Sequence, residues 1–273
     1  MPEAGTAGIS GPRAGAGPNP TATSVALLLA VWRPAYIAWG LAQLMQGPLT
    51  PPPAPTMRWR KVLGSGHQGG FGLRPAWNRL GLFCAFDHTD SARKWLAESD
   101  EVARWKDRAE QWLTVLLEPL ASRGSWSGHS LAVAQSDAAP PPDTMVASLT
   151  RASIRPHLAR RFWSLSPAAE VSLAQAPGCL FAVGLGEAPL LRQATFSLWH
   201  DQPAMDAYAR SGAHLEAIRQ AYSQGFFSES MFTRFRVLEI GGHWPQANPE
   251  LGQRMGQPLR QGREVGDRLD STV

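Results

Sequence analysis

The chain carries near its beginning the stretch Val25-Ala-Leu-Leu-Leu-Ala-Val-Trp-Arg-Pro34, an apolar run of strand type that ends at Arg-Pro. Further along lies a stretch of the same design, Ala147-Ser-Leu-Thr-Arg-Ala-Ser-Ile-Arg-Pro156. In both, the proline takes the favoured first-turn position of a helix that follows. Two copies of one strand-to-helix junction predict that the chain contains an internal repeat.

Three further pairs of segments keep the same order in the two halves. They are Trp59–Gly66 with Cys179–Gly186, Phe83–His88 with Phe196–Asp201, and Val115–Trp126 with Val237–Trp244. Each half then reads strand, helix, strand, strand, helix, strand, which is the order of a ferredoxin-like unit. Because such a unit leaves one sheet face bare, two units should pack bare face to bare face. We therefore expect an α+β fold in which tandem ferredoxin-like repeats form a pseudo-dimeric α+β barrel around an apolar cavity.

Composition gives the expected boundaries. Residues 24–128 should form the first repeat and residues 144–246 the second, with an Ala- and Pro-rich linker at 129–143. Residues 1–23 and 247–273 should be disordered tails.

The composition is typical of a globular protein and favours a pocket for an apolar ligand. Of 273 residues, 44% are hydrophobic and 18% charged, and the net charge of +4 comes from basic residues scattered without a run. This pattern excludes a disordered chain and carries no sign of nucleic-acid binding. Eleven Trp and ten Phe stand against three Tyr, which suits an apolar pocket.

An aromatic pocket between the two sheets is the predicted substrate site. We expect it to be lined by Trp59, Phe83, Phe86, Phe181, Phe196 and Trp199. His214 has no counterpart in the first half, and it is either a haem ligand on a helix or a surface residue after the Ser-Gly break. Arg33 and Arg155, at matching strand ends, either clamp haem propionates or a lipid-like polar group, or are ordinary solvated strand ends.

Two motifs are rejected as cofactor sites. Gly64-Ser-Gly-His-Gln-Gly69 matches a dinucleotide-binding pattern, but the glycines and proline that follow prevent the required helix. We expect a loop over the cavity mouth or a plain turn there instead. His88-Thr-Asp90 has the spacing of two iron ligands, but it stands at a helix start, where capping explains it better.

Cysteine usage and hydropathy place the chain in the cytoplasm. Cys84 and Cys179 sit in apolar runs and are expected to be buried thiols in a reducing compartment. The run Val25–Trp32 is too short to span a bilayer. Peripheral membrane contact is expected at Pro48–Trp59 or at Phe226-Phe227, with a solvated loop as the default for both.

Several blocks resemble the spheroidene monooxygenase family, the bacterial carotenoid 2-oxygenases, over most of the chain from Val25 to Trp244. The blocks are Gly64-Ser-Gly66, Gly69-Gly-Phe71, Arg123-Gly-Ser-Trp-Ser-Gly128, Leu149-Thr-Arg-Ala152, Arg155-Pro156, Arg161-Phe-Trp163, Val183-Gly-Leu-Gly-Glu-Ala-Pro189, Gln193-Ala-Thr-Phe-Ser-Leu-Trp199 and Arg210-Ser-Gly-Ala-His214. The last block is also similar to the axial-histidine helix of haem-degrading members of the dimeric α+β barrel superfamily.

The resemblance implies oxygen-dependent insertion at carbon 2 of an acyclic carotenoid, which gives a 2-keto product in two rounds. It also implies molecular oxygen as co-substrate, reduced ferredoxin as electron donor and haem as cofactor. A polyene has no acidic proton and no side chain activates dioxygen alone, so hydroxylation calls for a metal or a flavin. Because no flavin-type site is present, haem iron on His214 is the expected centre.

Two other classes of protein stay open. One is a non-catalytic protein that binds a hydrophobic ligand or haem, and the other is a haem-degrading monooxygenase on the same barrel. A haem absorption spectrum and a carotenoid conversion assay separate them.

Overall fold

The computed structural model describes residues 22–47, 50, 54–70, 72, 74–133, 141, 144–188, 190–210, 216, 219–220, 223–245 and 247–255. Its first strand, β1 (Ser24–Trp32), is buried from end to end. Leu27 and Leu29 face the inside of the barrel, whereas Leu28 faces the helices outside. The run has to be apolar throughout because both faces of the strand are covered.

Each half contributes four strands and the helices between them. The first half contains β1, η1 (Pro34–Tyr36), α1 (Ile37–Gln46), β2 (Met57–Gly66), η3 (His67–Gly69), β3 (Pro75–Phe86), α2 (Thr89–Glu98), α3 (Asp100–Arg108) and β4 (Ala109–Gly124). The second contains β5 (Val146–Ile154), η4 (Pro156–Leu158), α4 (Ala159–Ala174), β6 (Cys179–Ala188), β7 (Arg192–Trp199), α5 (Gln202–Ala209) and β8 (Phe227–His243), and α7 (Pro249–Arg254) follows it.

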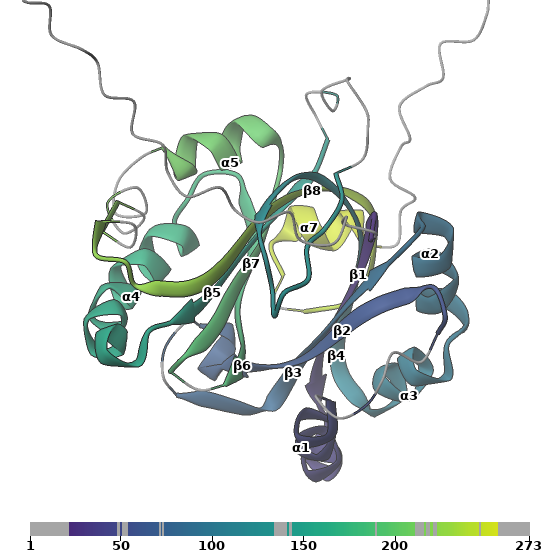
Figure 1. Ribbon diagram of the computed structural model, residues 1–273. Helices are drawn as coiled ribbons and strands as arrows, with labels where there is room; N and C mark the ends of the chain where they lie inside the picture. The colour runs from purple at the N-terminus through teal and green to yellow at the C-terminus, as the bar shows by residue number, and fades with distance from the viewer. Residues whose placement is uncertain are drawn as a thin grey trace, which may run out of the picture.

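The strands close into one antiparallel barrel in the order β1-β3-β2-β6-β7-β5-β8-β4 (Figure 1). The predicted α+β barrel is therefore confirmed. Two seams join the halves. The β4·β8 seam pairs the two strands along most of their length, whereas the β2·β6 seam is confined to the pairs Gly64–Gly186 and Ser65–Leu185. The barrel is held firmly on one side and by a short junction on the other.

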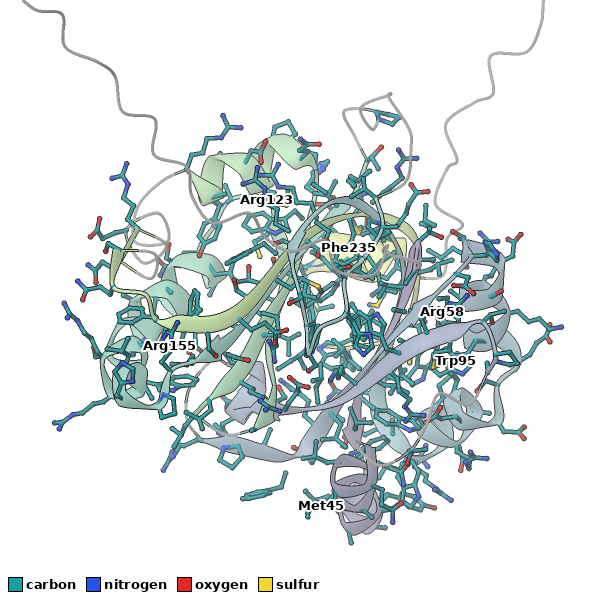
Figure 2. All side chains as sticks on the ribbon, in the orientation of Figure 1. Met45, Arg58, Trp95, Arg123, Arg155 and Phe235 are labelled. Carbon is teal, nitrogen blue, oxygen red and sulfur yellow. The ribbon has the colours of Figure 1, made fainter. Side chains whose placement is uncertain are left out.

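Helices cover the outside of the barrel, with α1, α2 and α3 over the first half and α4 and α5 over the second (Figure 1). Phe86 and Trp199, predicted to line the interior, belong to these outer layers instead. Phe86 packs on Trp95 of α2 and Trp199 on Tyr208 of α5, with ring centroids 5.7 and 5.2 Å apart. In Figure 2, Trp95 lies on the α2 side of the sheet while Phe235 lies in the middle of the barrel.

The expected tails are partly wrong. Ala22 is buried and pairs with Leu131, and α7 forms where the chain was expected to be disordered. Asn248 caps α7 by accepting from the N–H of Glu250 at 2.9 Å. Leu251 is 0% exposed and joins the interior core, so α7 is anchored to the barrel by burial. Figure 1 shows this helix across the middle of the barrel.

Candidate functional site

Four charged side chains meet inside the barrel. They are Lys61 of β2, Arg151 of β5, Glu187 of β6 and Glu229 of β8. Each stands two residues from an apolar residue of the interior core on the same strand, so strand alternation puts it on the inner face. We call these four residues the charged cluster.

Arg151 holds the charged cluster together and is 1% exposed. Its Nη2 donates to Glu187 Oε2 at 3.0 Å, and its Nη1 donates to Glu229 Oε2. Lys61 adds a second cation, with Nζ 3.1 Å from Glu187 Oε1. Two cations face two carboxylates, so the charges compensate one another, as burial in an apolar interior requires.

The loop after β4 closes over the charged cluster. Ser125 Oγ and the Gly128 N–H both donate to Glu229 Oε1, at 2.9 and 3.0 Å. Trp126 Nε1 donates to Glu187 Oε2 at 2.9 Å. One loop of the first half therefore binds carboxylates on two strands of the second half.

Both carboxylates stay ionised near neutral pH. Burial on its own raises the pKa of Glu187, but the hydrogen bond from Trp126 and the charge of Lys61 outweigh it, and the pKa is lowered. Burial likewise raises the pKa of Glu229, but the Gly128 N–H and other donors outweigh it and bring the pKa to about 2. A general acid at neutral pH needs a pKa near 7, so neither carboxylate suits that role.

An aromatic group packs against the charged cluster from inside the barrel. Trp59 stacks on Phe83 and on His129, with ring centroids 5.3 and 5.6 Å apart, and Trp126 contacts both Trp59 and Phe83. Burial, and then the charge of Lys61, lower the pKa of His129, so its imidazole is neutral near neutral pH. These rings pack on one another beside the charged cluster. An open chamber was expected in this part of the interior.

A pocket of about 200 Å³ lies over the short β2·β6 seam. We call it the seam pocket. Its walls come from α1, β2, β3, α4, β6 and β7, and most of the side chains are apolar. The residues that line it are Leu41, Leu44, Gly64, Ser65, Gly66, Gly70, Gly72, Arg74, Pro75, Ala76, Trp77, Leu80, Trp163, Gly184, Leu185, Gly186, Glu187, Ala188, Leu190, Arg192, Gln193 and Ala194.

Gly66, Gly70 and Gly72 of the glycine-rich segment form part of this wall, and the close packing of the segment leaves no room for side chains at two of its positions. A Cβ on Gly66 would lie 2.1 Å from the carbonyl oxygen of Gly70. Gly69 has φ +85°, and a Cβ there would lie 2.2 Å from Arg79 Nη1. A 3-10 turn and then β3 follow, so the described residues after these glycines do not form the α-helix that a dinucleotide site requires. The segment lines the seam pocket and not the aromatic cavity between the sheets, over whose mouth it was expected to lie.

Glu187 connects the seam pocket with the charged cluster. Among the described residues of the cluster, it is the one that also lines the pocket. Its Oε2 accepts from Trp126 and Arg151, and its Oε1 lies beside Lys61. The carboxylate is thus engaged inside the barrel, and the pocket wall gains no unpaired charge from it.

Some of the aromatic residues predicted to line the pocket face the interior of the barrel, and others belong to the outer layers. Trp59, Phe83 and Phe196 face the interior as expected and are 5% exposed or less. Phe181 packs half-buried against that core and meets Trp244 edge to face at 5.6 Å. With Phe86 and Trp199 outside, four of the six residues point inward.

Arg33 and Arg155 do not converge. Strand β1 runs antiparallel to β4, β4 to β8, and β8 to β5, so β1 and β5 run in opposite directions. The two arginines, which follow the ends of β1 and β5, therefore lie at opposite ends of the barrel, and both are exposed. Two residues so placed cannot hold the propionates of one haem, and the solvated strand end describes them better. Figure 2 shows Arg155 at the periphery.

His214, the predicted haem ligand, lies outside the described residues. Within the described part, no group of three or more His, Cys, Asp or Glu side chains could hold a metal ion. His88 and Asp90 stand at the start of α2, where Asp90 pairs with Arg93, and the side-chain cap predicted at this position is not formed. Capping by a side chain is absent at His88 but present at Asp201, which accepts from the Ala204 N–H at 2.8 Å.

In the two segments expected to touch a membrane, the aromatic side chains that the structure describes are buried or packed against other rings. Phe226 is fully buried and Phe227 packs on Phe162 at 5.9 Å, while Trp59 is interior. Among the described residues, no helix is long and apolar enough to cross a bilayer. Both cysteines are free; Cys84 is buried as expected and Cys179 is half-buried.

Comparison with solved structures shows that the fold is shared with a known protein. Aldoxime dehydratase in complex with butyraldoxime matches with a TM-score of 0.51 at 11% identity, covering 81% of each chain. A likeness at this identity shows a shared fold and nothing more. No protein-family model matches the sequence.

Sequence comparison with curated proteins is more specific. A spheroidene monooxygenase of Rubrivivax gelatinosus is 47% identical over 218 residues, which cover 80% of this chain and 83% of the relative. A spheroidene monooxygenase of Rhodobacter capsulatus is 36% identical over 214 residues, covering 78% and 89%. The chain belongs to the spheroidene monooxygenase family, as its sequence blocks indicated, and is an oxygenase.

The structure brings together residues that sequence reasoning did not select as a site. Trp126, Arg151 and Glu187 each stand in a block that carried the family resemblance, yet the charged cluster they form was missed. Strand alternation could have indicated that Arg151 points inward, because it follows the apolar Leu149 by two residues and therefore shares its face of the strand. A charge on the inner face of an otherwise apolar strand marks a buried ion pair.

Proposed function

We propose that this protein inserts oxygen at carbon 2 of acyclic carotenoids and gives the 2-keto product in carotenoid biosynthesis. The 47% identity to a spheroidene monooxygenase over four-fifths of the chain is the observation that carries this proposal. The barrel fold and the apolar seam pocket support it, because the substrate is a long hydrocarbon.

The reaction needs oxygen and electrons in two rounds. In the first, one atom of dioxygen enters a C–H bond at carbon 2 and the other leaves as water, with two electrons and two protons consumed. The second round hydroxylates the same carbon, and the geminal diol loses water to give the ketone. The electron donor we propose is reduced ferredoxin, in keeping with the resemblance.

Haem is the cofactor we propose, and His214 is the residue that would hold its iron. A polyene offers no acidic proton and protein side chains do not activate dioxygen alone, so the chemistry has to come from such a group. Arg33 and Arg155 are not part of this proposal, since they lie at opposite barrel ends. A Soret band in the purified protein that disappears in His214→Ala would support the ligand, and an active colourless enzyme would refute it.

We also infer that the barrel consists of two ferredoxin-like repeats in a pseudo-dimeric arrangement. Counted within each half, the strands stand in the order 4-1-3-2, which supports this inference. Residence in the cytoplasm, with transient contact to the membrane that holds the substrate, completes the proposal.

Expression in a host that accumulates acyclic carotenoids tests the function. A 2-keto carotenoid that forms with the wild-type chain and not with an empty vector is the expected result. Recovery of carotenoid bound to the protein but chemically unchanged would favour a carrier. Breakdown of added haem by the purified protein, without carotenoid oxidation, would favour the haem-degrading alternative.

A further inference from the structure

We propose that the seam pocket binds one end of the acyclic polyene. This inference rests on the proposed function, because it takes a carotenoid as the ligand. It assigns the pocket over the β2·β6 seam as the site where the terminal hydrocarbon segment is held.

The size of the pocket favours binding of an end rather than of a whole ligand. Pockets that enclose a drug-sized ligand measure roughly 300–1,000 Å³. The seam pocket offers about 200 Å³, too little for a long polyene but enough for its terminal carbons. The remainder of the chain has to leave the pocket through its mouth.

The mouth of the pocket is suited to contact the remainder of the polyene, which extends out of the pocket. Trp77 is 63% exposed and Leu190 is 47% exposed, and both line the pocket. Large apolar side chains so exposed gain contact area when a hydrocarbon lies across them. Trp163 Nε1 donates to the carbonyl of Leu190 at 2.8 Å, which ties the turn of the mouth to α4.

The interior of the pocket offers a ligand no unpaired charge. The carboxylate of Glu187 is bound by Trp126, Arg151 and Lys61, and Ser65 Oγ donates to the Gly184 carbonyl at 2.8 Å. The two cations of the wall, Arg74 and Arg192, are exposed. A hydrocarbon end therefore enters without stranding a buried charge.

A glycine in the wall leaves open the space that the hydrocarbon end would occupy. A Cβ built on Gly64 meets Leu44 Cδ2 at 3.7 Å and the Gly186 carbonyl at 3.8 Å, which are ordinary contacts. An alanine therefore fits at this position, but a leucine would extend into the pocket. Gly252 in α7 has nothing within 4 Å of its Cβ and lies outside the pocket, so Gly252→Leu is a matched control.

Binding of a detergent-solubilised acyclic carotenoid to the full chain tests the proposal. The polyene is achiral, so circular dichroism in its visible band appears only when the protein holds it. We expect Gly64→Leu to weaken binding by about tenfold or more, which corresponds to about 1.4 kcal/mol. The exposed Trp77→Ser should fold normally and weaken binding by about fivefold, and Gly252→Leu should bind as the wild type does.

Conversion assays on the same variants separate this proposal from the function. If the wild type converts the carotenoid while Gly64→Leu and Trp77→Ser bind and convert it equally well, the pocket assignment is wrong and the function stands. If the wild type neither binds nor converts the carotenoid, both are wrong. Normal thermal unfolding of Trp77→Ser ensures that lost binding reports on the pocket and not on misfolding.

Discussion

Arg151 of β5 and Glu187 of β6 are joined inside the barrel, with Arg151 Nη2 3.0 Å from Glu187 Oε2, although β7 lies between their strands. The same guanidinium reaches Glu229 on the other side of β5. Arg151 thus links three strands of the second half, and the loop at Trp126 joins them to the first half. We therefore expect stability and site geometry to depend on this buried cation.

Replacement of Arg151 by methionine should lower the free energy of unfolding by about 3 kcal/mol, because two half-buried carboxylates lose the buried cation that they share. Urea denaturation followed by far-ultraviolet circular dichroism measures this loss. The control is Arg33→Met, since Arg33 is exposed, and it should change the free energy by no more than about 0.5 kcal/mol. Equal effects in the two variants would show that the charged cluster does not stabilise the barrel.

Stability should fall in acid through Glu229. Its pKa is about 2 in the folded chain, against about 4.3 in an unfolded one. Because the folded pKa is the lower one, the ionised carboxylate stabilises the fold above the unfolded pKa, and this stabilisation is lost as the pH falls toward the folded value. The Tm difference between wild type and Glu229→Gln should therefore shrink between pH 4.3 and about pH 2. A difference that stays constant across this window would contradict the lowered pKa.

Two glycines of the pocket wall should respond differently to a methyl group. Gly66→Ala should destabilise the chain by about 1–3 kcal/mol, because its Cβ meets a backbone carbonyl that cannot move alone. Gly72→Ala should be close to neutral, since nothing lies within 4 Å of its Cβ. Chemical denaturation of both variants measures the contrast. The constraint on the segment would be absent if both variants unfolded like the wild type.

Helix α7 should stabilise the barrel although it follows the second half. Leu251→Ala should cost about 2–5 kcal/mol, as for other buried leucines. Val171→Ala, on an exposed site of α4, should stay within about 0.5 kcal/mol. Thermal unfolding of the two variants decides whether this segment is part of the core or behaves as the disordered tail that the sequence predicted.

The strand-to-helix junctions were predictable because they combine an apolar run with Arg-Pro, and both appear at β1 and β5. The inward face was harder to predict, since helices cover the outside and both faces of a strand are apolar. Even so, Phe83 and Phe86 stand three residues apart on one strand and must point to opposite sides. They could not both have lined one cavity, and Phe196 and Trp199 repeat the same error.

Strand alternation can mark Arg151 as an inward charge, but neither its partners nor the seam pocket could be located from sequence, because both are built by strands distant along the chain. Lys61 and Glu187 meet only because β2 closes on β6. Nothing local in either strand indicates that pairing. The direction of β5 relative to β1, which separates Arg33 from Arg155, likewise follows from closure of the barrel.

The most direct test is conversion of an acyclic carotenoid by the purified protein with reduced ferredoxin under isotope-labelled dioxygen. The account predicts a product oxygenated at carbon 2 whose first-round hydroxyl carries the label by mass spectrometry. Carotenoid recovered unchanged under conditions where the protein binds it, or a hydroxyl whose oxygen comes from water, would contradict the assignment as a carotenoid oxygenase.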